Sequence, residues 1–322
     1  MESPEKEITQ VPEDSFSKVT FHSEQNVLLG SSWDASVNLY NTDEGFRSGY
    51  FKASAAVLDC DFYVHADTGI FGGLETRVQM HNFATNQTET LGEHNAPVKC
   101  IRFHRESGCV LSGSWDKTLR KWDPRAATKW QSTLELPGKV VTLSCAENTL
   151  VTSTNDKQVL VYDLRSLETP LEVKETPIKY QTRSLECMPN AKGYVIASIE
   201  GRVGVEYFEM PAKSYSFKCH RKDESGQIFV YPVNALAFHK KFGTFASGGS
   251  DCLVNVWDPE NKKRLWKLRQ YPSPVCSLSF NKEGSQLAIA CSYLFEQGDA
   301  PSQPPTKLYI REVQDTDVMP KS

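Results

Sequence analysis

The sequence predicts an all-β fold, namely a seven-bladed WD-repeat β-propeller. The tripeptide Ser32-Trp33-Asp34 returns as Ser114-Trp115-Asp116, and Gly249-Ser250-Asp251 is the same polar turn with another middle residue. Strands that end in Trp122-Asp123 and Trp257-Asp258 follow the last two of these turns. A repeat of about forty residues with a Trp-Asp strand ending is typical of a propeller blade.

The acidic or equivalent residue of each turn, here called the turn anchor, gives the register of all seven repeats. Successive anchors are separated by 41, 41, 40, 44, 51 and 41 positions, so only the fifth interval carries a sizeable insertion. A strand with apolar residues at alternate positions follows each of the first six anchors, as a half-buried strand requires. The anchors are Asp34, Glu75, Asp116, Asp156, Glu200, Asp251 and Ser292.

The last repeat suggests how the ring closes. It contains only three candidate strands, one fewer than a blade needs: Val275–Phe280, Gln286–Ala290 and Lys307–Val313. We expect the N-terminal segment Glu7–Val11 to supply the outer strand of this blade, because pairing the two chain ends removes a free sheet edge.

These assignments define the predicted domain organisation. Residues 1–313 form a single seven-bladed β-propeller, and residues 314–322 form a flexible C-terminal tail. The segment Glu296–Thr306, which is rich in Pro, Gln and Gly, is predicted to be a mobile loop within the last blade.

Charge and cysteine content exclude several classes of protein. The chain carries 36 Lys and Arg against 40 Asp and Glu, so no overall field favours nucleic acid as a partner. No apolar stretch is long enough to span a membrane, and the first residues do not resemble a signal peptide. The nine cysteines are scattered without close pairs, as expected in a reducing compartment.

The sequence offers no catalytic constellation. It contains no Gly-rich phosphate loop, no His-Glu-x-x-His helix and no Gly-x-Ser-x-Gly elbow, so we predict no enzyme activity, no metal site and no cofactor. Two histidines fall at repeat positions within the same four-residue set: His94, Ser112, Asp116 and Trp122, and then His220, Ser247, Asp251 and Trp257. Because the set repeats, we interpret it as a structural network of the blade.

Two tryptophans mark the predicted binding surface. Trp33 and Trp115 each stand directly before a turn anchor, and these turns open on one face of a propeller around its central channel. Ser250 at the same position of the sixth repeat indicates that the turn itself does not need a Trp. Exposed Trp is a frequent interface hot spot. The alternative is that both tryptophans pack between adjacent blades.

A group of cations is predicted near the same face. Arg183 begins the first strand of the fifth repeat, Arg202 lies in its anchor turn, and Lys218 and Arg221 precede the sixth repeat. Residues 174–222 hold nine Lys or Arg against five Glu, a local charge of +4 in a chain of −4. Arginines on one face suit a carboxylate or a phosphate, because the guanidinium fork pairs with both. The alternative is that these cations belong to an ordinary solvated surface and bind no ligand.

Five longer strings are more specific than the WD repeat alone: Gly113–Thr118, Lys179–Arg183, Ser198–Val203, Phe217–Arg221 and Tyr231–Asn234. Together they resemble the Bub-type WD-repeat adaptors of the spindle-assembly checkpoint, over nearly the whole predicted propeller. The sister family that acts in nuclear mRNA export shares part of this set.

The resemblance implies two binding sites. Members of this family hold the Glu-rich GLEBS motif of a checkpoint kinase, and of its kinase-like relative, across the anchor-turn face. The matching positions here are Trp33 and Trp115 as aromatic contacts and Arg183 as the partner of a Glu in the motif. The family also reads phosphothreonine in the Met-Glu-Leu-Thr repeats of the kinetochore scaffold, and the matching positions are Arg202, Arg221 and Lys218.

The function implied by the resemblance is that of a mitotic adaptor that recruits checkpoint kinases to kinetochores. It implies a monomeric propeller within hetero-complexes, located in the nucleus and, in mitosis, at the kinetochore and centromere of the chromosome. The anaphase-inhibitory checkpoint complex is a further implied partner, whereas nucleic acid and membranes are not expected as partners. The alternative is a WD-repeat mRNA-export factor that binds a nucleoporin GLEBS motif.

Overall fold

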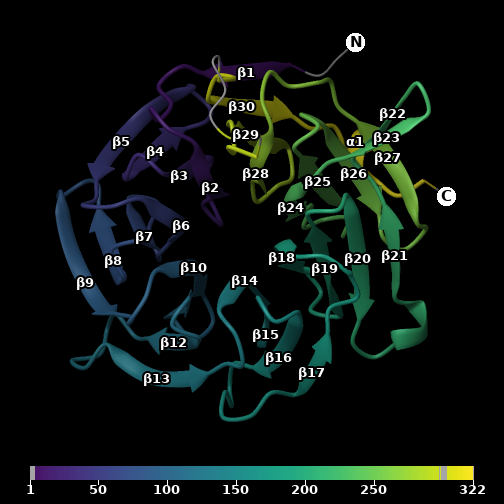
Figure 1. The fold of residues 1–322 in the computed structure, drawn as a ribbon. Helices are drawn as coiled ribbons and strands as arrows, with labels where there is room; N and C mark the ends of the chain where they lie inside the picture. The colour runs from purple at the N-terminus through teal and green to yellow at the C-terminus, as the bar shows by residue number, and fades with distance from the viewer. Residues whose placement is uncertain (1–3, 297, 299–302, 322) are drawn as a thin grey trace.

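The computed structural model describes residues 4–296, 298 and 303–321. Within these residues, seven four-stranded antiparallel sheets surround a central channel (Figure 1). Each sheet runs from an inner strand beside the channel to an outer strand at the rim. The predicted seven-bladed propeller is confirmed. No helix of the described residues is long and apolar enough to cross a membrane.

The strands of each blade are consecutive in the chain, except in the last blade. Blade 1 consists of β2 (Phe16–Phe21), β3 (Val27–Ser32), β4 (Ser36–Asn41) and β5 (Phe46–Lys52). Blade 2 consists of β6 (Val57–Phe62), β7 (Thr68–Gly73), β8 (Arg77–Asn82) and β9 (Gln87–Glu93). Blade 3 consists of β10 (Val98–His104), β11 (Cys109–Ser114), β12 (Thr118–Trp122) and β13 (Trp130–Glu135). Blade 4 consists of β14 (Val140–Ala146), β15 (Thr149–Thr154), β16 (Gln158–Asp163) and β17 (Glu172–Glu175).

Blade 5 consists of β18 (Thr182–Cys187), β19 (Gly193–Ser198), β20 (Arg202–Tyr207) and β21 (Tyr215–Lys218), with a short 3-10 helix at Pro211–Lys213. Blade 6 consists of β24 (Val233–Phe238), β25 (Phe245–Gly249), β26 (Val254–Asp258) and β27 (Lys263–Lys267). Blade 7 consists of β28 (Val275–Phe280), β29 (Gln286–Cys291), β30 (Lys307–Glu312) and the N-terminal β1 (Glu5–Ile8). The remaining elements are the hairpin β22 (Arg221–Glu224) with β23 (Gln227–Val230) and the helix α1 (Asp315–Val318).

The apolar core lies between neighbouring blades. Side chains alternate along each strand, so the two faces of a blade both carry apolar residues toward an adjacent blade. For example, Leu29 and Val37 of blade 1 pack with Val57 and Phe71 of blade 2, and all four are buried. Because every blade packs on two neighbours, burial of apolar surface holds the ring together.

The ring closes through the N-terminal strand, as expected, but with a different segment. β1 is Glu5–Ile8 rather than Glu7–Val11, and it pairs antiparallel with β30 so that Glu5 lies opposite Arg311. The Glu5 carboxylate accepts a hydrogen bond from the Tyr271 hydroxyl at 2.8 Å and pairs with Arg311 at 3.3 Å. These contacts, together with complete burial of Ile8, account for the shift of the strand toward the N-terminus.

The C-terminal segment differs from the predicted flexible tail. Residues 315–318 form α1, and Val318 is buried against blades 6 and 7. The Thr244 hydroxyl donates to the Val318 carbonyl at 2.8 Å, and Lys241 pairs with Asp315 at 2.6 Å. One apolar residue that finds a site beside the last blades is enough to dock so short a segment. Ser322 lies outside the described residues, as do residues 297 and 299–302 of the predicted loop.

Candidate functional site

The anchor turns share one backbone geometry, which places the residue before each anchor on the same face of the ring. The residue that follows each of the first six anchors has a positive φ, between 60° and 70°. The residue before the anchor donates its backbone N–H across the blade, for example from Trp33 to the Ser15 carbonyl at 3.0 Å and from Trp115 to the Pro97 carbonyl at 3.0 Å. We call the face that carries these turns the upper face.

The same backbone hydrogen bond shows that the turn anchor of blade 7 was assigned to the wrong residue. In blade 7 the equivalent N–H belongs to Ser292, which donates to the Pro274 carbonyl at 2.9 Å. Ser292 therefore corresponds to Trp33, and Tyr293 rather than Ser292 stands at the anchor position. Spacing alone gave the wrong residue because 41 positions, the interval between the first anchors, lead from Asp251 to Ser292, whereas Tyr293 lies 42 positions after Asp251.

Trp33 and Trp115 do not pack between the blades. Trp33 is 46% exposed and Trp115 is half-buried, and neither belongs to the apolar clusters that join the described blades. Leu74, at the equivalent position of blade 2, is also exposed and lies between them in the order of the ring. The sequence interpretation missed Leu74, although its place directly before the anchor Glu75 marks it.

Arg183 lies beside Trp33 at the mouth of the channel. It is the second residue of β18, and both side chains line an upper cavity of about 450 Å³ together with Asp14, Lys99 and Phe295. The Arg183 guanidinium pairs with the Glu296 carboxylate at 3.3 Å. This arginine therefore already holds a carboxylate in the free protein, which is the chemistry expected of a partner for a Glu-rich peptide.

The three other predicted cations converge on the edge between blades 5 and 6. Arg202 begins β20 and lies directly opposite Lys218 at the end of β21. Arg221 lies three residues after the end of that strand and donates to the Glu200 carbonyl at 3.0 Å and to its carboxylate at 3.2 Å. Arg202 approaches the same carboxylate at 3.9 Å. The structure thus brings Arg202 and Arg221 to one acidic side chain and places Lys218 opposite Arg202.

Glu200 is a member of this site that the sequence interpretation missed as a contact. In blades 3 and 6 the anchor carboxylate accepts from a histidine, at 2.9 Å for Asp116 with His94 and at 2.7 Å for Asp251 with His220. The loop that leads into blade 5 contains no histidine. The Glu200 carboxylate therefore has no histidine partner and pairs with arginines instead. Comparison of the repeats could have shown this, because the histidine is missing from the sequence before blade 5.

The histidine networks have the structural role that their repetition predicts. His94 contacts the Ser112 hydroxyl at 2.7 Å, and the Trp122 indole N–H donates to the same hydroxyl at 2.8 Å. His220, Ser247 and Trp257 repeat this arrangement in blade 6. Burial lowers the pKa of His94 to about 4, so the imidazole is neutral at physiological pH.

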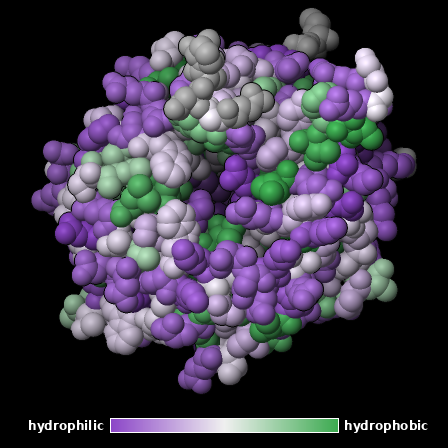
Figure 2. Space-filling model, in the orientation of Figure 1, coloured by the Kyte–Doolittle hydropathy of each residue, from purple (hydrophilic) through white to green (hydrophobic). Residues whose placement is uncertain are grey.

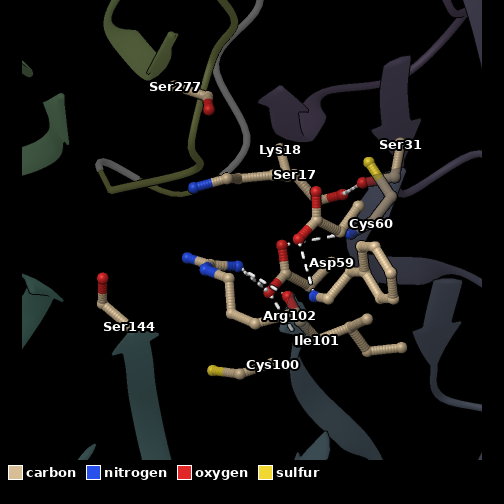
Figure 3. A network of polar contacts seen from close by, with 12 residues as sticks. Ser17, Lys18, Ser31, Asp59, Cys60, Cys100, Ile101, Arg102, Ser144 and Ser277 are labelled. Atoms are coloured by element: carbon tan, nitrogen blue, oxygen red, sulfur yellow. Dashed lines mark hydrogen bonds and ion pairs between the residues drawn. The ribbon is translucent and has the colours of Figure 1, made fainter. Parts of the chain in front are cut away.

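Below the upper cavity, a polar bridge crosses the channel, and Figure 3 shows the part of it in which Arg102 meets Asp59. Arg102 of blade 3 pairs with Asp59 of blade 2 at 2.9 Å and with Glu186 of blade 5 at 3.5 Å. Glu186 also pairs with Lys18 of blade 1 at 3.6 Å and accepts from the Ser144 hydroxyl of blade 4 at 2.9 Å. A lower cavity of about 550 Å³ lies beyond this bridge and shares Lys18, Arg102 and Glu186 with the upper one.

The described residues contain no group of three or more His, Cys, Asp or Glu side chains that could hold a metal ion. All nine cysteines are free in the structure. Burial raises the pKa of the Cys60 and Cys100 thiols to about 12, so these thiols behave as small apolar groups of the blades.

Comparison with known proteins places these features in a class. The family description "WD domain, G-beta repeat" matches residues 85–123 and 214–258. The solved "Structure of U3-55K" superposes with a TM-score of 0.80 over 95% of this chain and 98% of that chain, at 15% sequence identity, which shows a shared fold. The protein is a WD-repeat β-propeller.

Relatives that match nearly the whole chain show the family to which it belongs. The chain is 41% identical to "Mitotic checkpoint protein BUB3.1" of Arabidopsis thaliana over 98% of this chain and 95% of that protein. It is 37% identical to "Mitotic checkpoint protein bub-3" of Caenorhabditis elegans over 95% and 92%. It is 30% identical to "Poly(A)+ RNA export protein" of Schizosaccharomyces pombe over 98% and 92%. The chain belongs to the Bub3 family of mitotic checkpoint proteins.

Proposed function

We propose that this protein is an adaptor of the spindle-assembly checkpoint that binds phosphorylated peptides between blades 5 and 6 and GLEBS motifs on its upper face. The convergence of Arg202 and Arg221 on Glu200, with Lys218 opposite Arg202, carries this proposal. In this role it recruits a checkpoint kinase and its kinase-like relative to the phosphorylated kinetochore scaffold. The names of the checkpoint relatives support the mitotic setting.

Charge explains why phosphorylation would control binding. A phosphothreonine carries a charge of about −1.5 to −2 at pH 7 and three strong acceptor oxygens. Such a group can displace the single carboxylate of Glu200 from Arg202 and Arg221, and Lys218 is exposed beside them. An unmodified Thr supplies only a neutral hydroxyl, which cannot compete with a carboxylate for two guanidinium groups.

The upper face suits a Glu-rich segment for a different reason. Trp33 offers an exposed aromatic surface, Trp115 a half-buried one, and Arg183 a guanidinium that already donates to the Glu296 carboxylate. A GLEBS peptide would replace Glu296 at Arg183 with its own Glu and cover the tryptophans with apolar side chains. Burial of Trp commonly dominates the affinity of such an interface.

The proposed partners and location follow from these two sites. Simultaneous occupation joins a kinase that carries the GLEBS motif to the scaffold, and the anaphase-inhibitory checkpoint complex is a further proposed partner. The protein would then act in the nucleus, and at the kinetochore and centromere in mitosis, as a monomeric propeller within hetero-complexes.

The deciding experiment is calorimetric titration of the protein, alone and loaded with a GLEBS peptide, with a Met-Glu-Leu-Thr peptide in phosphorylated and unphosphorylated forms. We expect heat only with the phosphorylated form. Equal affinity for both forms would contradict the phosphothreonine site.

The second candidate function is that of an mRNA-export factor that binds a nucleoporin GLEBS motif. The observation that favours it is the relative named as a poly(A)+ RNA export protein, which matches nearly the full chain at 30% identity. Both functions use Trp33 and Trp115, so binding of a GLEBS peptide does not separate them. Dependence of peptide binding on the phosphate separates the two functions, because the export function needs no phosphothreonine.

A further inference from the structure

Four Ser-Pro or Thr-Pro dipeptides occur in the sequence, and they differ in how accessible the hydroxyl residue is. Ser273 is fully buried. Thr176 is half-buried, and its backbone N–H donates to the Lys157 carbonyl at 2.8 Å. Thr169 is exposed, and Ser3 lies outside the described residues. A hydroxyl residue directly before Pro is the acceptor that proline-directed protein kinases require, and within the described residues Thr169 is the accessible one.

Thr169 lies in the irregular segment 164–171, which connects β16 to β17 at the outer rim of blade 4 (Figure 1). In Figure 2 hydrophilic residues project from the lower edge of the molecule at this place. Neither the hydroxyl nor the backbone of Thr169 forms a hydrogen bond within the described part of the chain, whereas the Leu171 N–H donates to the Val161 carbonyl at 2.7 Å. A loop residue without such bonds can enter the cleft of another enzyme at little conformational cost.

A polar cavity lies directly beside this segment. It has a volume of about 430 Å³, lies between the outer parts of blades 3 and 4, and is lined by Lys121, Arg165 and Glu168. Lys121 lies opposite Leu111 in blade 3, and Leu111 packs toward blade 4, so the Lys121 side chain lies on the same side. Because Glu168 lines the cavity and Thr169 follows it in the chain, a phosphate on Thr169 can reach this cavity.

The two cations of the cavity are available to a further anion. No ion pair joins Lys121 to a described residue. Arg165 donates to the Asp163 carboxylate from Nε and Nη2, and its Nη1 has no partner in the described part of the chain. Glu168 is exposed, so its carboxylate can turn to solvent when a phosphate with a charge of about −1.5 to −2 enters.

We propose that Thr169 is a phosphorylation site for a proline-directed protein kinase, and that Lys121 and Arg165 hold its phosphate in the cavity between blades 3 and 4. In the reaction the Thr169 Oγ1 attacks the γ-phosphorus of ATP, the hydroxyl proton passes to the catalytic carboxylate of the kinase, and ADP leaves. The phosphate then connects the loop after β16 to β12 of the neighbouring blade. This inference is independent of the two ligand sites proposed above, which lie on other surfaces.

The first test is treatment of the full chain with a purified mitogen-activated protein kinase and Mg-ATP, followed by mass spectrometry. A Ser3→Ala background removes the N-terminal Ser-Pro dipeptide. We expect one phosphate on Thr169, none on Thr176 and none on Ser273, and complete loss of the phosphate in Thr169→Val. A synthetic peptide of residues 165–180 is the control, because without the fold both of its threonines should be phosphorylated.

The second test measures the contacts of the phosphate by phosphorus NMR. Neighbouring cations favour the doubly charged form of a phosphate, so its second titration should occur at a pH lower by roughly 0.5 to 1 than in the Lys121→Ala/Arg165→Ala double variant. Lys139→Ala is the matched control, because Lys139 is an exposed cation at the start of blade 4 that does not line the cavity. This variant should titrate as the unsubstituted protein does.

Three outcomes would overturn the inference. A folded protein that is not phosphorylated on Thr169, while the peptide is, would remove the modification site. The same phosphate titration in the unsubstituted protein and in K121A/R165A would leave the phosphate in solvent and remove its contacts in the cavity. A dimer that forms on phosphorylation and that Arg202→Ala dissociates would assign the phosphate to the arginines of a second copy of the chain.

Discussion

At the scale of single residues, the contacts of Arg202 separate binding from folding. Arg202 is partly exposed and touches only Glu200 and Ser216 by polar contacts, so its removal leaves no buried partner unpaired. We expect Arg202→Ala to abolish binding of the phosphorylated peptide while the free energy of unfolding stays within about 0.5 kcal/mol. Titration and urea unfolding measure the two effects.

A matched control exists in blade 4. Arg165 pairs with Asp163 two residues earlier, as Arg202 does with Glu200, but it lies far from the proposed site. Arg165→Ala should therefore leave phosphopeptide binding unchanged. Phosphopeptide binding by R202A at the affinity of R165A would contradict the assignment of Arg202.

The tryptophans of the upper face give a second prediction at this scale. Truncation of Trp33 or Trp115 to Ala should weaken binding of a GLEBS peptide by about 2 kcal/mol, because exposed Trp side chains are typical hot spots. Trp130 on the outer strand β13 is 52% exposed and serves as the control, since Trp130→Ala removes a comparable side chain from another surface. An equal effect of W130A would indicate a general loss of stability instead.

His94 adds a prediction about pH. Burial lowers its pKa to about 4, below the usual value near 6.5, so the unfolded chain takes up a proton on this histidine between these two values and the folded chain does not. The contribution of His94 to stability is therefore present above pH 6.5 and lost as the pH falls toward 4. Urea unfolding at several pH values should show a shallower decline for His94→Asn than for the unsubstituted protein, and parallel declines would contradict this account.

At the scale of elements, the short strand β1 has an effect on stability larger than its length suggests. Ile8 is fully buried between blades 1 and 7, so Ile8→Ala leaves a cavity where the ring closes. We expect a loss of about 2–4 kcal/mol in the free energy of unfolding, measured by urea denaturation. The exposed neighbour Thr9 is the control, and a T9A variant as unstable as I8A would contradict the role of burial.

The elements also show where sequence reasoning stops. Alternating apolar residues predicted the blade strands, because each strand needs a buried face. The pattern did not give the bounds of β1, since its register depends on the contact of Glu5 with Arg311, more than three hundred positions away. The insertion between blades 5 and 6 was visible as an interval of 51 residues, but its hairpin was not predicted. The two residues of its turn, Ser225 and Gly226, both have positive φ, and this Ser-Gly dipeptide is a local sequence signal for a turn.

At the scale of the whole molecule, the bridge through Arg102 connects blades that are not neighbours. Arg102 is largely buried and compensates the carboxylates of Asp59 and Glu186. Arg102→Ala should cost about 3–5 kcal/mol of unfolding free energy, because it leaves the Asp59 carboxylate without its cation and Glu186 with Lys18 as its remaining cation. Adding Asp59→Asn and Glu186→Gln should recover part of this loss, and urea unfolding without any recovery would contradict the bridge.

The bridge could not be predicted from the sequence. Repeat register aligns equivalent positions of successive blades, and it placed Trp33, Trp115 and the anchors on one face. It says nothing about which inner-strand residues meet across the channel, because Arg102 and Glu186 belong to blades 3 and 5. The same limit explains why Glu200 was recognised as an anchor but not as the carboxylate between Arg202 and Arg221.

The pairing of β1 with β30 also sets an order of events during synthesis. The ribosome makes β1 before any blade exists, and β30, which pairs with it, is the last of the described strands to be made. Until β30 is made, the nascent chain carries β1 without a partner strand. The face of blade 1 that packs on blade 7 is also uncovered. Products that stop short of β30 would keep both exposed, and such surfaces are what chaperones and proteases recognise. Ring closure thus requires that the chain be translated through β30.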